Sequence, residues 1–178
     1  NRGGLLRAIT IPEKGGTAGW IDTAGVYGAL PYRIKCKVQG LQIIHSYERT
    51  HRSQNMVGGS ADLFREVLHP LVYVHPEIGL PVLNISPSTA EEIIGLSLAE
   101  GAELLEYLVE FATREERAYV HEWEPGDVVL WDNWRTMHRA YGHLKRYPRL
   151  VHRTTLKSDM RLGRWIENKD ARPRYAAE

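Results

Sequence analysis

The chain has little cysteine, no long apolar run and no marked excess of positive charge, and each absence excludes a class of protein. A single cysteine, Cys36, stands among 178 residues, which excludes an internal disulfide and fits a reducing cytoplasm. No apolar run approaches the length of a membrane-spanning helix, and no signal-peptide pattern opens the chain. The 23 lysines and arginines balance 22 acidic residues, so no basic stripe for nucleic acid is expected. We therefore expect a cytoplasmic protein with no membrane and no nucleic-acid partner.

The composition supports one globular unit. With 43% hydrophobic and 25% charged residues, residues 1–178 can bury one core, which predicts a single domain. Helices are predicted over 24–30, over 32–39, and after the capping box that runs from Ser97 to Glu100. We assign Leu105, Leu108 and neighbouring apolar residues at helical spacing to core packing. Cys36 is interpreted as a small buried apolar residue.

Short strands dominate the rest of the chain. Tyr119, His121 and Trp123 alternate with other residues at strand periodicity, and a turn at 124–127 leads into the next strand. The predicted strands cover 5–11, 19–21, 41–47, 66–74, 81–85, 119–123, 128–131 and 149–156. This pattern favours a mainly β fold with flanking helices, arranged as a double-sheet jelly roll. Residues 48–62 are polar and form a candidate mobile lid loop, and the tail from Asn168 is expected to be an extended arm.

The most informative residues are one histidine and two arginines near the C-terminal end. His138 follows a hydrophobic strand and a Trp131-Asp132-Asn133 turn, and Arg149 and Arg153 come eleven and fifteen residues later. A neutral imidazole can bind a divalent metal, and a guanidinium can hold a carboxylate in two-pronged geometry. We place the three side chains on two adjacent strands of the β core.

Three segments resemble one family of oxygenases. Residues 11–16 are similar to its PxxGG turn, residues 69–85 to its HPxVxxHP segment, and residues 125–156 to its WDNR…H…RxxxR ending. These segments resemble the Fe(II)/2-oxoglutarate dioxygenases of the taurine dioxygenase and 2,4-dichlorophenoxyacetate dioxygenase (TauD/TfdA) family. The resemblance implies a double-stranded β-helix, or jelly roll. It also implies an enzyme that uses Fe(II), 2-oxoglutarate and O2, releases succinate and CO2, and hydroxylates or oxidatively cleaves a small organic substrate.

The resemblance also implies roles for individual residues. His138 is the expected distal metal ligand, and the other two ligands, a His-x-Asp, are expected upstream of Asn1, so an N-terminal portion is expected to be missing. Arg149 would pair with the distal carboxylate of 2-oxoglutarate. Arg153 would bind an anionic substrate, or alternatively an internal Asp or Glu. The family threonine falls at Ala18, so we expect Thr17 to make that co-substrate contact through a shifted loop.

Several alternatives remain open. His75-Pro76-Glu77 is formally His-x-Glu, but a hairpin turn is favoured there. Asp132 and Asn133 are expected to fix their turn, and His69 is expected to be a surface or satisfied strand residue. A different class of function is a non-catalytic jelly-roll module that binds a small organic acid, and the sequence before Asn1 would distinguish it. A nucleic-acid demethylase is disfavoured by the charge. We also expect a homo-oligomer, and the reaction outcome stays open between hydroxylation, cleavage, desaturation and halogenation.

Overall fold

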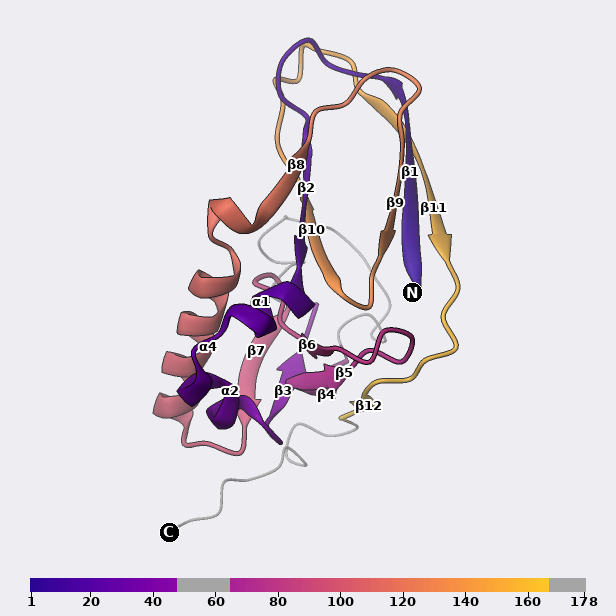
Figure 1. Cartoon of the computed structure of the whole chain (residues 1–178). Helices are drawn as coiled ribbons and strands as arrows, with labels where there is room; N and C mark the ends of the chain where they lie inside the picture. The colour runs from indigo at the N-terminus through magenta and orange to yellow at the C-terminus, as the bar shows by residue number, and fades with distance from the viewer. Residues whose placement is uncertain (48–64, 167–178) are drawn as a thin grey trace.

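Two antiparallel sheets face each other and form the upper part of the molecule in Figure 1. The computed structural model describes residues 1–47 and 65–166. The first sheet contains, in spatial order, β11 (Leu150–Leu156), β1 (Gly3–Thr10) and β9 (Val128–Asp132). The second contains β10 (Thr136–Ala140), β2 (Ala18–Asp22) and β8 (Ala118–His121). The predicted mainly β jelly roll with flanking helices is confirmed.

Aromatic side chains fill the space between these sheets. The ring of Trp20 on β2 lies 5.8 Å from Trp131 on β9 and 6.3 Å from Trp123 between ring centroids. All three indoles are buried. Gly4 of β1 allows the close approach, because a Cβ there would lie 2.2 Å from Cζ2 of Trp131. A glycine is required where a backbone meets a large ring this closely.

A helix-covered sheet forms the lower part of the molecule (Figure 1). Its strands, in spatial order, are β12 (Arg164–Trp165), β4 (Val67–Pro70), β3 (Gln42–His45) and β7 (Ala90–Ile94). β5 (Val72–Val74) and β6 (Pro81–Leu83) form a separate hairpin. The helices are α1 (Thr23–Ala29), α2 (Tyr32–Val38), α4 (Leu98–Ala112) and the short 3-10 helix η2 (Glu115–Arg117). Apolar side chains from α1, α2 and α4, from strands β3, β6 and β7 and from the loops beside them form the largest buried cluster of the described residues.

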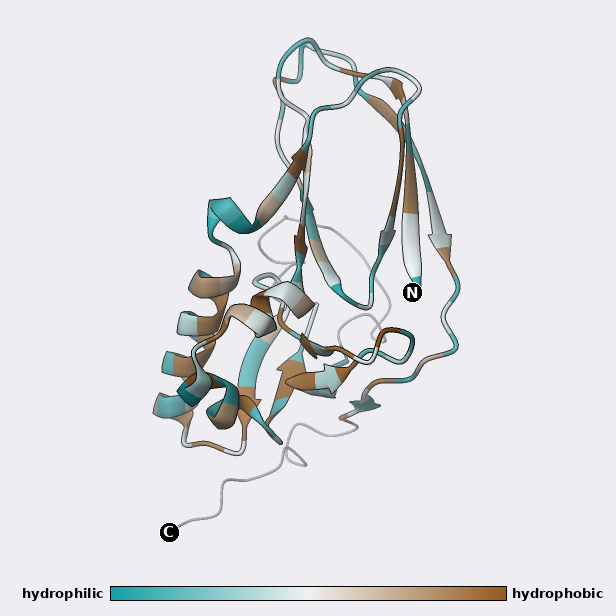
Figure 2. Ribbon diagram, viewed as in Figure 1, coloured by the Kyte–Doolittle hydropathy of each residue, from teal (hydrophilic) through white to brown (hydrophobic). Residues whose placement is uncertain are grey.

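Helix α4 begins as its sequence predicts. Ser97 Oγ accepts from the Glu100 backbone N–H, and the Glu100 carboxylate accepts from the Ser97 N–H, which completes the capping box. Leu104, Leu108 and Phe111 are buried on the face that meets the core, whereas Leu105 is only partly buried. Figure 2 shows apolar and polar residues alternating along α4. The buried stripe therefore lies slightly to one side of the predicted one.

The structure corrects several predicted elements. The expected strand over 66–74 is broken at Leu71, so β4 pairs with β3 and only β5 pairs with β6. Strands β7 and β12 were not predicted. Cys36 is exposed on α2 and is not a core residue. The candidate lid over 48–62 and the arm from Asn168 lie outside the described residues. None of the described helices is long and apolar enough to span a membrane.

Candidate active site

His138 points into the space between the two upper sheets. On β10 it lies opposite Trp20 of β2, and Trp20 belongs to the buried aromatic cluster. Directly opposed residues share one face of a sheet, so the imidazole faces the same interior. Its ring centroid lies 4.9 Å from that of Trp131. His138 is an exposed residue, yet partial desolvation lowers its pKa and the positive charge of Arg153 lowers the pKa further.

Arg153 reaches His138 from the opposite sheet, which corrects the predicted placement on adjacent strands. Strand β11 pairs with β1, and β10 pairs with β2, so these two strands do not touch edge to edge. The Arg153 guanidinium carbon lies 5.7 Å from the centroid of the Trp131 ring. Trp131 is therefore the shared neighbour of the imidazole and of the guanidinium.

The Arg153 side chain is exposed and meets no carboxylate of the described residues in an ion pair. Its recorded contact is the indole face of Trp131, a cation–π arrangement that holds the charge without neutralising it. The alternative of an internal Asp or Glu partner thus finds no support within residues 1–47 and 65–166. The guanidinium can accept an anion from outside the fold.

Arg149 lies against the Gly15-Gly16 turn. It immediately precedes β11, and its Nε–H donates to the Gly16 carbonyl at 3.3 Å. Gly16 has a φ of +73°, and a Cβ there would lie 2.7 Å from Pro12 Cγ and 3.3 Å from Arg149 Cδ. Only glycine suits this conformation and this contact. Within the described chain, the terminal amino groups of Arg149 have no recorded partner, which leaves the planar end of the fork open.

Thr17 follows this turn, and the structure gives its side chain no recorded partner among the described residues. Its carbonyl accepts from the Tyr141 N–H at 2.9 Å, which fixes the backbone. Ala18 is buried in the aromatic cluster and carries no hydroxyl. The assignment of Thr17 to the co-substrate therefore stays a prediction, as do those of Arg149 and Arg153.

The turn before His138 is held by Asp132. Its carboxylate accepts from the Trp134 N–H at 2.8 Å, from the Arg2 guanidinium at 2.5 Å and from His75 Nε2 at 3.0 Å. Desolvation raises the pKa of Asp132, but the bonds from Arg2, Trp134 and His75 outweigh it and lower the pKa overall. Arg2 also stacks 4.2 Å from the centroid of Trp134. Asp132 thus fixes the turn, as predicted.

His75 is a structural residue and not a metal ligand. The ring is buried, with Nε2 on Asp132 and Nδ1 accepting from the backbone N–H groups of Glu77 and Ile78 at 3.2 and 3.4 Å. The Glu77 carboxylate pairs with Arg2 at 2.6 Å. Both side chains of the formal His-x-Glu are therefore engaged in bonds within the fold. Among the described residues, no cluster of three or more His, Cys, Asp or Glu could hold a metal ion.

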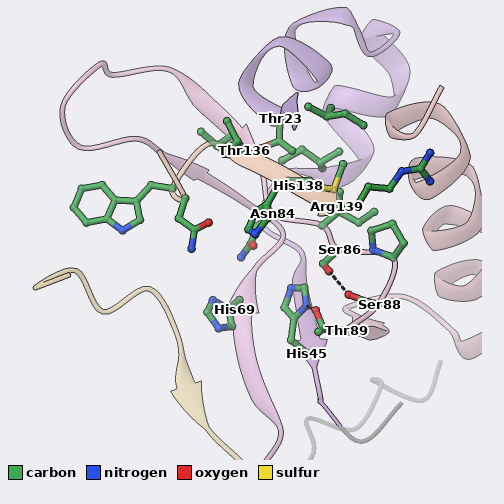
Figure 3. A pocket seen from close by; sticks show the side chains of 18 of the residues that line it. Thr23, His45, His69, Asn84, Ser86, Ser88, Thr89, Thr136, His138 and Arg139 are labelled. Atoms are coloured by element: carbon green, nitrogen blue, oxygen red, sulfur yellow. Dashed lines mark hydrogen bonds between the residues drawn. The ribbon is translucent and has the colours of Figure 1, made fainter. Parts of the chain in front are cut away.

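A cavity of about 1310 Å³ extends from His138 toward the lower sheet. Figure 3 shows His45 on β3 and His69 on β4 side by side in its wall, with His138 on β10 beyond them. Neither Arg149 nor Arg153 lines this cavity. His69 is neither on the surface nor satisfied, because its buried Nδ1 has no hydrogen-bond partner in the described part of the chain. A histidine at the end of each of two apolar strands was the available signal, and only the pairing of β3 with β4 joins them.

Comparison with known proteins identifies the family. The profile of the family described as "Taurine catabolism dioxygenase TauD, TfdA family" matches residues 1–155. A relative from Sphingobium herbicidovorans, named (S)-phenoxypropionate/alpha-ketoglutarate-dioxygenase, is 37% identical over 151 residues, which cover 78% of this chain and 51% of the relative. The chain spans about half the length of the curated relatives it matches.

Two solved structures share the fold. A taurine dioxygenase from Burkholderia xenovorans superposes with a TM-score of 0.79 at 35% identity, over 94% of this chain and 58% of that chain. AAD-2 in complex with Mn(II) and N-oxalylglycine superposes with a TM-score of 0.76 at 30% identity, over 94% of this chain and 64% of that chain.

Proposed function

Because the chain belongs to the TauD, TfdA dioxygenase family, we propose that it is part of an Fe(II)- and 2-oxoglutarate-dependent oxygenase. The proposed reaction hydroxylates or oxidatively cleaves a small anionic organic substrate with O2, and it releases succinate and CO2. One observation carries the proposal. His138 and Arg153 come from facing sheets and both lie beside Trp131, while Arg149 lies on the Gly15-Gly16 turn.

The described residues fit an iron ion only in part. His138 suits a metal because desolvation and Arg153 lower its pKa, which keeps an imidazole lone pair available at neutral pH. It is a single ligand, and a family centre with two histidines and one carboxylate needs two more. The proposed His-x-Asp upstream of Asn1 would supply them. Bound Fe(II) with 2-oxoglutarate would supply the oxidising chemistry, and the residues of this chain would bind, orient and exclude water.

Arg149 is the proposed anchor for 2-oxoglutarate. Its Nε–H is held by the Gly16 carbonyl, which fixes the plane of the guanidinium. A fixed planar fork matches a carboxylate in two-pronged geometry. Thr17, next to the same turn, is the proposed hydroxyl donor. The N-oxalylglycine in the AAD-2 complex is a dicarboxylate like 2-oxoglutarate, which supports a co-substrate of this kind.

Arg153 is the proposed partner of the anionic group of the substrate. The guanidinium stands in front of an indole and meets no carboxylate of the described residues. Because the guanidinium is exposed and keeps its charge, it is available to pair with an anionic group of the substrate. The named substrates of relatives agree, since phenoxypropionate is a carboxylate and taurine is a sulfonate. An anion at Arg153 would place the neighbouring carbon atoms close to His138.

Anaerobic spectroscopy tests this proposal. Full-length protein with Fe(II) and 2-oxoglutarate should give the weak visible charge-transfer band of the chelate. His138→Ala should remove the band, whereas His152→Ala, on the outward face of β11, should retain it. A band that persists in His138→Ala would contradict the assignment. Binding of 2-oxoglutarate without iron and without succinate release would favour the non-catalytic acid-binding module.

Cellular location and assembly also remain proposals. A cytoplasmic location is supported by the single free thiol of Cys36, which is exposed and suits a reducing compartment. A homo-oligomer stays a prediction, which light scattering of the full-length protein would test.

A further inference from the structure

Two histidines in the cavity wall carry nitrogen atoms that the fold leaves unused. The His45 and His69 rings meet edge to face, with centroids 5.4 Å apart. Nε2 of His45 and Nδ1 of His69 are buried, and neither has a hydrogen-bond partner among the described residues. Buried polar atoms without partners are rare, and each costs free energy unless a ligand or water satisfies it.

Both rings are neutral at neutral pH. Burial, followed by the neighbouring His69, lowers the pKa of His45 to about 4, although the backbone of Asn84 opposes the shift. Burial also lowers the pKa of His69. A neutral imidazole carries one N–H donor and one acceptor nitrogen. The pair therefore presents hydrogen-bonding capacity without charge.

The side chains that form recorded hydrogen bonds at or near the pair are also uncharged. Thr89 Oγ1 bonds His45 Nδ1 at 2.9 Å, and the hydroxyls of Ser86 and Ser88 bond each other at 3.1 Å nearby (Figure 3). Asn84 donates to the Pro70 carbonyl at 3.2 Å. Arg153 does not line the cavity. The histidine pair on β3 and β4 is thus bordered by neutral polar groups. The charged residues Arg65, Glu115 and Arg139 also line the cavity, whereas Arg153, which is proposed for anion binding, lies outside it.

We propose that His45 and His69 bind an uncharged hydrogen-bonding group, a hydroxyl or an amide, at the end of the substrate remote from its anion. This inference rests on the proposed function, because it adds a second recognition element for the same proposed substrate. A hydroxyl both donates and accepts, so it can satisfy an acceptor nitrogen on one ring and an N–H on the other. An anion would meet at most one donor from each ring. An alkyl tail would leave both nitrogens unsatisfied.

Two probes that differ by one hydroxyl test the proposal. Binding of hexyl sulfate and of 6-hydroxyhexyl sulfate is measured by calorimetry on full-length protein loaded with Mn(II) and N-oxalylglycine. We expect the hydroxylated probe to bind at least about tenfold more tightly, because it satisfies buried polar groups that the other leaves unpaired. His45→Phe and His69→Phe should each abolish this preference and retain or improve the binding of hexyl sulfate. His152→Phe, on an exposed strand face, should keep the wild-type preference.

A second measurement needs no variant to fold. In metal-free protein labelled with ¹³C-histidine, 6-hydroxyhexyl sulfate should shift two ring signals that hexyl sulfate leaves in place. Equal affinity for the two probes, no binding of either, or unmoved His45 and His69 signals would overturn the proposal and leave these nitrogens to water. Signals moved only by Zn(II) would overturn it in favour of a metal site. The proposed function is tested separately: it is wrong if full-length protein with Fe(II) forms no succinate from 2-oxoglutarate, whatever the result with these two probes.

Discussion

The lower, helix-covered part of the molecule differs in construction from the region between the two upper sheets. We call this region, which holds the buried tryptophans together with His138, Arg149 and Arg153, the mouth. The lower core consists of aliphatic side chains such as Ile43, Leu83 and Leu108, which are at most 1% exposed. The mouth contains tryptophans, and beside them His138 and Arg153 stay exposed. Aliphatic burial stabilises the fold at about 25 cal/mol per Å². In the mouth, the exposed imidazole and guanidinium contribute less of this burial energy, but they remain accessible to ligands.

This difference separates stability from chemistry along the chain. Strands β3 and β7 and helix α4 carry most of the buried aliphatic cluster, whereas β10 and β11 carry the candidate active-site residues. Substitutions in the lower core should therefore lower the free energy of unfolding. Substitutions in the mouth should instead change ligand affinity and the turnover rate.

The largest effect is expected at the mouth. His138→Ala should lower turnover of 2-oxoglutarate by more than about a hundredfold, since even outer partners of metal ligands are worth roughly 10–100-fold. Its midpoint of urea unfolding should stay close to that of the wild type, because His138 is an exposed residue. Succinate release and chemical denaturation measure the two quantities. If His138→Ala is unfolded and is inactive only for that reason, the proposed separation of stability from catalysis is wrong.

The matching test in the lower core is Leu108→Ala. Leu108 is 0% exposed, so its truncation should cost about 2–5 kcal/mol of unfolding free energy, measured in urea. Leu98→Ala is the control, because Leu98 is 64% exposed at the start of the same helix. We expect that control to change stability by less than about 0.5 kcal/mol. Folded Leu108→Ala should keep the wild-type KM for 2-oxoglutarate, and a raised KM would contradict the comparison.

Arg149→Lys sharpens the comparison within the mouth. Lysine keeps the charge but loses the planar fork and the bond to the Gly16 carbonyl, so the KM for 2-oxoglutarate should rise at least about tenfold. Arg146→Lys, on the exposed loop before β11, is the matched control. If the affinity for the organic substrate changes instead, Arg149 and Arg153 have exchanged their proposed roles.

Arg153→Gln should produce a smaller and more selective effect. We expect turnover of an anionic substrate to fall several-fold while the KM for 2-oxoglutarate stays nearly unchanged, because Arg153 faces Trp131 and not the Gly15-Gly16 turn. Arg7→Gln is the control, since Arg7 is exposed on the opposite face of the same sheet. Equal turnover of neutral and anionic substrates by the wild type would remove the anionic assignment.

A further expected effect is a pH dependence of stability that originates in the cavity wall. Folding lowers the pKa of His45 from 6.5 to about 4, so between these values the unfolded chain binds a proton that the folded chain does not. Stability should therefore fall as the pH drops from about 6.5 toward 4. Urea unfolding across this range should show a shallower slope for His45→Phe than for the wild type. Identical slopes would mean that His45 is not buried in a neutral form.

The sequence by itself determined the local features. The capping box of α4 follows from side chains that bond their own backbone neighbours, and the Gly15-Gly16 turn follows from two residues that adopt a positive φ because they lack a Cβ. The jelly-roll class follows from short strands at regular spacing. The pairing of β4 with β3 instead of β6 could not be read from residues 66–85, because strand pairing depends on distant segments.

The tertiary structure alone decided which side chains meet. The separation of His138 and Arg153 along the chain is fixed, but only sheet order places them on facing sheets with Trp131 as a common neighbour. His45 and His69 are 24 residues apart and meet because β3 and β4 are neighbours. Their unused nitrogens arise from burial, which is a property of the whole fold. Spacing in a sequence specifies a local geometry, whereas burial and contact across sheets follow from how the whole chain packs.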